Sequence, residues 1–166
     1  MDNELLMKLY GTYQKELYLY LYSLCRNWHQ AEDLLHETFL KALLALPDGH
    51  TNMRAWLYMV ARNLFYNQQK KRSKEILSEG QDAVTEDCAK GDLLENILAE
   101  ENRRMLYRAL QNLDLKKREI IQMQYFGGMS QKEIAAVLHI TPENVRVLAY
   151  RAKKELKKDL EELKGE

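Results

Sequence analysis

The segment from Ser130 to Lys158 carries side chains that suit nucleic-acid binding. At about 100° per residue, the stretch after Pro142 has one polar, basic face and one apolar face. Arg and Asn side chains can read base edges in a major groove, and Lys groups anchor on phosphates. We predict that the polar face binds duplex DNA. Its assigned residues are Thr141, Glu143, Asn144, Arg146, Val147, Tyr150, Arg151 and Lys154, with Lys158 beyond them.

A short helix followed by a longer one must position this face. Ser130 and Glu133 have the spacing of a capping box, which predicts a helix start at Ser130. After a turn at 139–140, Thr141 is a good N-cap and Pro142 suits the first position of a second helix. The layout is typical of a helix-turn-helix. A solvated helical hairpin is the alternative. The predicted inward stripe of the second helix is Val145, Leu148, Ala149, Ala152 and Leu156.

The composition predicts an all-α protein. Of 166 residues, 46% are hydrophobic, and two prolines and seven glycines leave long stretches free to form helices. No stretch is long and apolar enough to cross a bilayer, and no signal peptide is recognisable. We therefore expect a cytoplasmic protein with no membrane insertion.

Charge is distributed unevenly although the net charge is zero. Residues 1–72 carry nine Lys and Arg against seven Asp and Glu, and residues 102–166 carry fourteen against nine. Residues 73–101 carry two against nine. This pattern predicts two small helical domains, 1–72 and 102–166, joined by a flexible acidic linker over 73–101.

Periodicity resumes toward the second domain. Ser73–Glu86 shows little periodicity, which predicts a flexible segment. Helices are predicted over residues 93–112 and 115–126, and Gly127-Gly128 would end the second of them.

The sequence offers little for catalysis or metal binding. Its four histidines are scattered, and no glycine-rich phosphate loop or paired carboxylate beside a nucleophile is present. Cys25 and His29 lie one helical turn apart, but a packed thiol beside a surface histidine is a simpler interpretation than zinc. Cys25 and Cys88 are too few for a disulfide framework. We predict no enzymatic activity, no cofactor and no metal.

The first domain is predicted to contain three helices, over residues 4–28, 30–46 and from Met53 to Arg72. In the second helix, Ala31, Leu35, Phe39, Ala42 and Leu46 form an inward stripe. The opposite side suggests a docking surface for a protein partner, because it is apolar and rimmed by charge. A central helix packed on both sides is the alternative. The residues on that side are Asp33, Glu37, Leu40, Lys41 and Leu44.

Aromatic side chains alternate with Arg, Asn and Gln in the third helix. This composition suits single-stranded nucleic acid, because bases stack on rings while cations follow the backbone. The alternative is an ordinary amphipathic helix whose basic end, Lys70–Arg72, complements its dipole. The predicted buried side is Trp56, Leu57, Val60, Ala61 and Leu64; Arg62, Tyr66 and Gln69 would face outward, with Tyr58 and Phe65 at the flanks.

Three motifs together resemble a bacterial extracytoplasmic-function (ECF) sigma factor. They are AEDLLHETFLKAL at Ala31–Leu43, RAWLYMVARN at Arg54–Asn63, and a C-terminal helix-turn-helix that ends VRVLAYRAKKEL. They occur in the family's order on either side of an acidic linker, and they cover nearly the whole chain.

The resemblance implies a non-enzymatic factor that binds core RNA polymerase and promoter DNA. Asp33, Glu37, Leu40, Lys41 and Leu44 would dock on the β′ clamp, and the β flap would be a further polymerase contact. The first domain would recognise and melt the −10 element, the second would read the −35 element as duplex, and an anti-sigma factor is an expected partner. The residues implied for the −10 element are His50, Asn52, Arg54, Tyr58, Arg62, Tyr66 and Gln69.

One departure and two rival functions remain at this point. Val147-Leu148 stands where many family members have a Ser-Arg pair, so the −35 base preference does not transfer. A stand-alone helix-turn-helix regulator is one rival, although it has no need of the outward leucines. A helical adaptor that binds only protein is the other.

Overall fold

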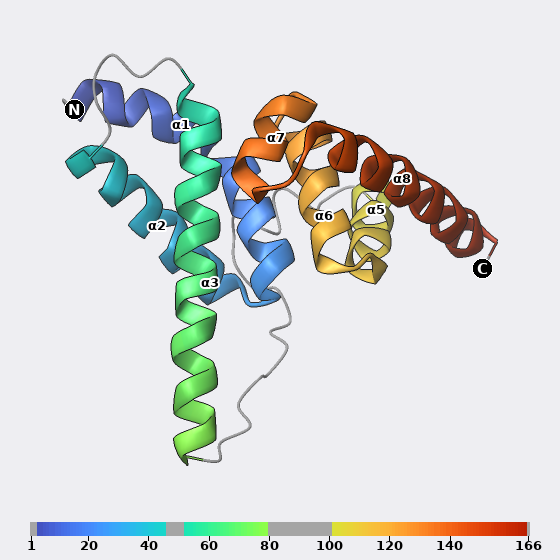
Figure 1. The fold of residues 1–166 in the computed structure, drawn as a ribbon, viewed down its shortest axis with the longest axis horizontal. Helices are drawn as coiled ribbons and strands as arrows, with labels where there is room; N and C mark the ends of the chain where they lie inside the picture. Colours follow the sequence, from blue (N-terminus) through green and yellow to red (C-terminus); the bar gives the residue numbers. More distant parts are fainter. Residues whose placement is uncertain (1–2, 46–51, 80–100, 166) are drawn as a thin grey trace. The chain divides into compact units, whose positions relative to one another are not determined.

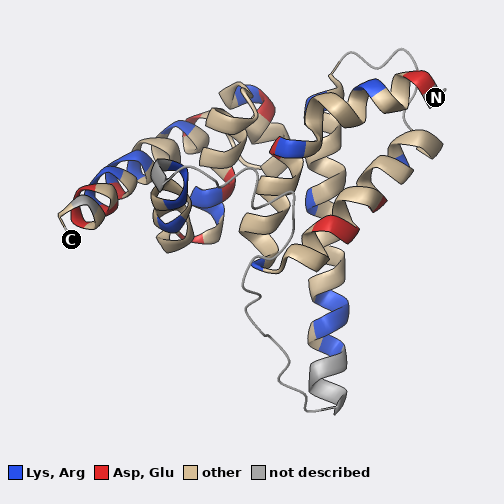
Figure 2. Ribbon diagram, turned by 180° about the vertical axis from the view of Figure 1, so that it is seen from behind, with Lys and Arg blue, Asp and Glu red and all other residues tan. Residues whose placement is uncertain are grey.

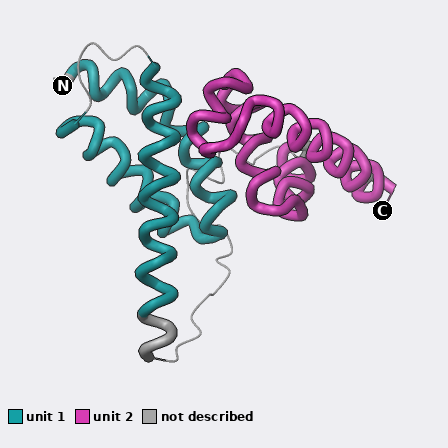
Figure 3. The backbone as a smooth tube through the Cα atoms, viewed as in Figure 1, with its two compact units in different colours: residues 1–91 teal, residues 92–166 magenta. Residues whose placement is uncertain are grey.

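The computed structural model describes residues 3–45, 52–79 and 101–165. The chain divides into two compact units, residues 1–91 and 92–166 (Figure 3). Every regular element in the described ranges is a helix, which confirms the predicted fold class (Figure 1). The first unit contains α1 (Asn3–Cys25), α2 (Trp28–Ala45) and α3 (Met53–Glu79). The second contains α5 (Glu101–Asn112), α6 (Leu115–Ile121), the π-helical turn η1 (Gln122–Phe126), α7 (Gln131–Leu138) and α8 (Pro142–Lys164).

The three helices of the first unit pack on one another. On α1, Leu9, Leu17, Leu21 and Leu24 are buried. The inward residues predicted for α2 are buried at every described position; Leu46 lies outside the described residues. On α3, Leu57 and Ala61 are fully buried. Aromatic edges join the helices, because the rings of Tyr10 and Phe39 lie 5.0 Å apart and those of Tyr20 and Tyr58 also lie 5.0 Å apart.

The break between α1 and α2 comes earlier than periodicity predicts. Arg26 has a left-handed backbone (φ 55°), and its N–H donates to the Tyr22 carbonyl at 2.8 Å, which ends α1. Asn27 then caps α2, because its Oδ1 accepts the Gln30 N–H at 3.0 Å. The predicted end of the first helix at 28 and start of the second at 30 are therefore wrong by two or three residues.

The third helix is longer than predicted. α3 continues to Glu79, so the part of Ser73–Glu86 up to Glu79 is helical rather than flexible. Residues 80–100, which hold most of the predicted acidic linker, lie outside the described residues.

The second unit has its core between α5, α6 and the C-terminal half of α8. Buried in it are Ala109, Leu110, Leu113, Ile121, Ala152 and Leu156. Arg118 on α6 is also buried, and its guanidinium donates to the carbonyls of Leu110 (3.1 Å), Gln111 (3.2 Å) and Leu113 (3.0 Å). Arg118 therefore satisfies backbone acceptors at the end of α5 that no later turn of that helix can reach.

The helix predicted over residues 115–126 ends before Gly127-Gly128, as predicted, but its last turn is a π-helix. After α6 the chain widens into η1, where the Gly127 N–H reaches the Gln122 carbonyl at 3.0 Å. Gly128 then adopts φ 61°, a left-handed conformation that glycine accepts without strain. Tyr125 and Phe126 are left exposed on this turn.

The caps of the helix-turn-helix form as the sequence predicts. The Glu133 N–H donates to Ser130 Oγ at 3.1 Å, and the Ser130 N–H donates to Glu133 Oε1 at 3.0 Å. His139 ends α7 in the left-handed region (φ 59°). Thr141 Oγ1 accepts the Asn144 N–H at 3.1 Å and starts α8.

Replacing Ser130 by alanine is expected to destabilise the second unit by ~1 kcal/mol, because one backbone donor of α7 loses its acceptor. Thermal unfolding followed by circular dichroism measures this loss. Ser130→Thr, which keeps the hydroxyl, is the matched control and should stay close to wild type. Equal melting of the alanine and wild-type chains would contradict the importance of this cap.

Candidate nucleic-acid and protein interfaces

The face of α8 assigned to DNA is exposed along its whole length. All eight residues from Thr141 to Lys154 named for it are exposed, including Val147 (39%) and Tyr150 (64%). On the opposite side, the predicted inward stripe is buried except at Leu148, which is only half-buried. The orientation of the helix is therefore confirmed, while its contact with DNA stays a prediction.

The exposed face of α8 combines cations with an aromatic ring. Arg146, Arg151 and Lys154 lie on it, and Lys154 Nζ sits 5.8 Å from the centroid of the Tyr150 ring. Figure 2 shows Lys and Arg along the helix, with acidic residues near its C-terminal end. Positive charge on an exposed recognition helix favours contact with phosphates as well as bases.

The side of α2 assigned to protein docking is also open. Leu40 is 55% exposed and Leu44 77% exposed, and Asp33, Glu37 and Lys41 are exposed around them. The described helices of the first unit thus leave this side open, and among them α2 is not packed on both faces. We call this set, Asp33, Glu37, Leu40, Lys41 and Leu44, the α2 stripe. Two large exposed leucines rimmed by charge are typical of a protein interface.

Three residues of the predicted −10 set remain on an open side of α3. Arg62, Tyr66 and Gln69 recur at helical spacing and are partly exposed. The Arg62 guanidinium lies 4.6 Å from the centroid of the Tyr66 ring. A cation beside a partly exposed ring suits a stacked base and its phosphate.

The prediction that Tyr58 belongs to the −10 set is wrong. Its side chain is fully buried, so it cannot contact DNA in this structure, and it packs against Tyr20 instead. Burial raises the pKa of Tyr58 well above its usual value, and the Glu16 carboxylate raises it further.

Asn52 and Arg54 have structural roles at the start of α3. Asn52 Oδ1 accepts the Ala55 N–H at 3.1 Å, as an N-cap does. Arg54 Nε donates to Glu16 Oε1 at 3.1 Å, and its guanidinium lies 5.1 Å from the centroid of the Tyr13 ring. Burial raises the pKa of Glu16, and the charge of Arg54 opposes that rise. His50, the remaining member of the set, lies outside the described residues.

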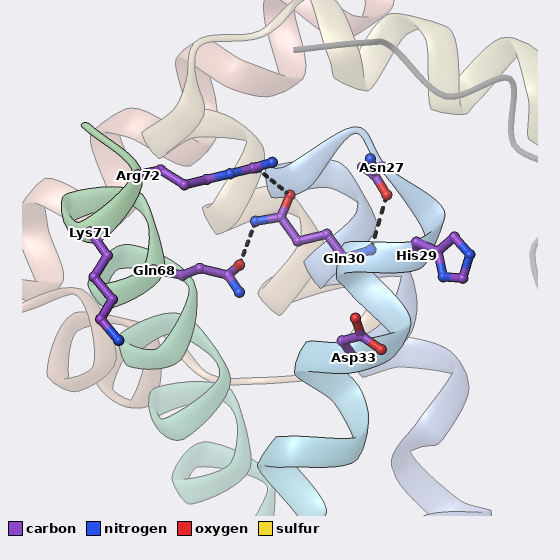
Figure 4. Close-up of a pocket in the computed structure, with 7 residues that line it drawn as sticks. All are labelled: Asn27, His29, Gln30, Asp33, Gln68, Lys71 and Arg72. Atoms are coloured by element: carbon purple, nitrogen blue, oxygen red, sulfur yellow. Dashed lines mark hydrogen bonds between the residues drawn. The ribbon is translucent and has the colours of Figure 1, made fainter. Parts of the chain in front are cut away.

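A polar cleft between α2 and α3 was missed from the sequence. It encloses about 450 Å³, and Figure 4 shows its lining. Its only sequence signal is Gln30, which lies three residues before Asp33 and so continues the α2 stripe. We call this feature the α2–α3 cleft; its lining residues are Asn27, His29, Gln30, Asp33, Gln68, Lys71 and Arg72.

Cys25 is a packed thiol, and His29 stacks on the neighbouring Trp28 ring at 4.0 Å between centroids. Within the described ranges, no group of three or more His, Cys, Asp or Glu residues is arranged to hold a metal ion. None of the helices described here combines the length and apolar character that a membrane span needs.

The Cys25 thiol is expected to resist alkylation. Burial raises its pKa from 9.0 to about 12, and the charge of Arg72 only partly opposes this. In a Cys88→Ser chain at pH 8, reaction with a thiol reagent should be at least about a hundredfold slower when folded than in urea. Because the folded pKa exceeds the unfolded one, the neutral thiol stabilises the fold below pH 9, and that stability is lost as pH rises toward 12. Equal rates in both states would contradict the burial of this group.

Two family models match the chain, one in each unit. The sigma-70 region 2 model matches residues 9–75, and the sigma-70 region 4 model matches residues 103–156. Among curated relatives, the Bacillus subtilis (strain 168) ECF RNA polymerase sigma factor SigX is 30% identical, over 95% of this chain and 84% of its own length. The B. subtilis RNA polymerase sigma factor YlaC is 31% identical, over 92% of this chain and 90% of its own length. The chain belongs to the ECF sigma factor family.

Solved structures agree with this ECF sigma factor in fold. The sigma factor RpoE of Bartonella quintana, in complex with the anti-sigma factor NepR, matches with a TM-score of 0.72 and 23% identity over 93% of this chain and 96% of that one. CnrH, in complex with the cytosolic domain of CnrY, matches with a TM-score of 0.65 and 22% identity over 96% and 90%. As an ECF sigma factor, the chain directs promoter recognition in transcription initiation. A stand-alone regulator is not favoured.

Proposed function

We propose that the α2 stripe is the surface by which this sigma factor docks on the β′ clamp of core RNA polymerase. The observation that carries this is the exposure of Leu40 and Leu44 beside Asp33 and Glu37 on a helix whose other side is buried. Apolar anchors surrounded by charge combine hydrophobic burial with a fixed orientation of the partner. The β flap is the proposed contact of the second unit, where Tyr125 and Phe126 provide exposed apolar surface.

The −35 element is proposed to lie against the exposed face of α8. Thr141 and Glu143 stand at the helix N-terminus, which is the end that approaches base edges in helix-turn-helix proteins. Arg146 and Arg151 supply donors for bases or phosphates. Val147 offers an apolar side chain that fits a thymine methyl group.

The −10 element is proposed to meet α3 through Arg62, Tyr66 and Gln69, with His50 from the preceding segment. Asn52 supports this surface by capping the start of α3, and Arg54 supports it by joining that start to Glu16 of α1. Extruding a base costs a few kcal/mol, which ring stacking and phosphate contacts must offset. Duplex recognition by one unit and single-strand recognition by the other would open DNA without ATP.

An anti-sigma factor is the proposed regulator. The structurally similar RpoE and CnrH were both solved with a bound protein, NepR and the cytosolic domain of CnrY respectively. The exposed leucines of the α2 stripe are a surface that such a protein could cover. Covering them would block polymerase docking by direct competition. We place this chain in the cytoplasm, where its proposed partners act.

Run-off transcription with purified bacterial core polymerase and genomic fragments tests the proposed function. We expect new start sites that require this chain, preceded by shared −10 and −35 sequences. A DNA footprint without polymerase, and no new transcripts, would instead support a stand-alone regulator. If neither new transcripts nor a footprint is observed, only the function of a protein adaptor remains.

A further inference from the structure

The α2 stripe continues beyond Asp33. Gln30 lies three residues before Asp33 and seven before Glu37, so helical spacing places it on the same side of α2. Its side chain reaches across to α3, where Nε2 donates to Gln68 Oε1 at 2.5 Å and Oε1 accepts from Arg72 Nη1 at 3.1 Å (Figure 4). The exposed stripe therefore runs directly into the α2–α3 cleft.

The cleft carries opposite charges on its two walls. Asp33 lies on the α2 wall, and Lys71 and Arg72 lie on the α3 wall. All three are exposed. A partner helix with basic side chains opposite Asp33 and Glu37, and an acidic side chain directed toward α3, would match both walls.

We propose that the polymerase-docking surface spans α2 and α3 together. The α2 stripe takes apolar and basic side chains of the polymerase, and the cleft takes an acidic side chain of the same partner at its α3 wall, which Lys71 and Arg72 line. This inference rests on the proposed docking function and extends it. It assigns the Lys71–Arg72 pair to protein binding, whereas the neighbouring Lys70 stays outside the docking surface.

Two observations favour an acidic protein side chain over a DNA phosphate in the cleft. Asp33 lines the cleft, and a row of phosphates passing there would be repelled by it, whereas a partner with mixed charge pairs with it. The cleft is also continuous with Leu40 and Leu44, which bind apolar side chains rather than a phosphate backbone. Arg72 is already oriented by the Gln30 amide, so less ordering is needed when the partner arrives.

The test measures binding of the full chain to core polymerase in the absence of DNA, by fluorescence anisotropy of an N-terminal label. Lys71→Glu and Arg72→Glu should each raise Kd by about tenfold or more. Lys71→Gln should lose less affinity for core polymerase than Lys71→Glu, because it removes the charge without reversing it. Lys70→Glu is the matched control: it changes an exposed lysine of the same helix that does not line the cleft, and Kd should stay within about twofold. Circular dichroism checks that every variant is folded.

Asp33→Lys and a promoter-opening assay at saturating sigma factor separate the possible results. Loss of core binding by Asp33→Lys but not by Lys71→Glu would keep the proposed function and overturn the two-helix surface. If Lys71→Glu leaves core binding unchanged, and Lys70→Glu and Lys71→Glu weaken promoter opening equally, this end of α3 binds DNA. That result would also overturn the two-helix surface. Unchanged core binding in both Asp33→Lys and Lys71→Glu would show that the proposed docking function itself is wrong.

Discussion

Replacing Leu40 by aspartate is expected to abolish association with core RNA polymerase while the fold survives. Leu40 is 55% exposed, so the free protein loses little buried surface. In the complex, the new carboxylate would be buried among apolar side chains without a partner, which is costly. We expect a loss of about a hundredfold or more in affinity, as for a central anchor of an interface. Asp33→Lys should act in the same direction by reversing a charge on the rim.

Co-purification with tagged core enzyme, followed by anisotropy titration, measures this effect. Gly11→Asp is the control, because it adds the same carboxylate to α1 at a position where a side chain meets open space. Its affinity and its melting temperature should match those of the wild type. Wild-type binding by both Leu40→Asp and Asp33→Lys would refute the α2 stripe as a docking surface.

Replacing Arg151 by alanine is expected to weaken promoter binding by the polymerase holoenzyme by about tenfold or more, since a base or phosphate contact is worth ~1–3 kcal/mol. Arg151 is exposed at the centre of the α8 face and has no buried role, so the free protein should melt as before. If the lost contact is to a phosphate, the slope of log K against log salt should become shallower by about one.

Promoter binding at several salt concentrations measures both effects. Lys15→Ala is the control, because Lys15 is an exposed lysine of α1, in the other unit, and belongs to none of the proposed interfaces. It should change affinity by no more than about twofold. Unchanged promoter activity in Arg151→Ala would mean that the turn before α8, and hence the register of its outward face, had been assigned wrongly.

The features predicted well from the sequence depend on local interactions. The Ser130–Glu133 capping box, the Thr141 cap and the Gly127-Gly128 stop involve residues within a few positions of one another, so their types and spacing suffice. The exposed α2 stripe was predicted for a similar reason, because one helix cannot direct both of its faces into the same core. Whether that second face was covered elsewhere could be decided only by the structure.

The features missed depend on residues that are distant in sequence. Periodicity placed Tyr58 at a helix flank, but Tyr20 of α1 packs on it and buries it completely. The α2–α3 cleft closes through Gln30 and Arg72, which are 42 positions apart. The left-handed Arg26 was missed for another reason: arginine seldom adopts a left-handed backbone, so its type does not mark this position as glycine or asparagine would.

The buried Arg118 makes the junction of α5 and α6 insensitive to acidity. One guanidinium fastens the end of α5 to α6 through three carbonyls, and arginine keeps its proton throughout the range in which proteins fold. A lysine there would have a shorter reach and no planar fork, and a histidine would release the end of α5 as it lost its proton. The junction of α5 and α6 should therefore stay fastened in acidified and in alkaline cells. Any response of this sigma factor to such stress would then have to arise at groups other than this guanidinium.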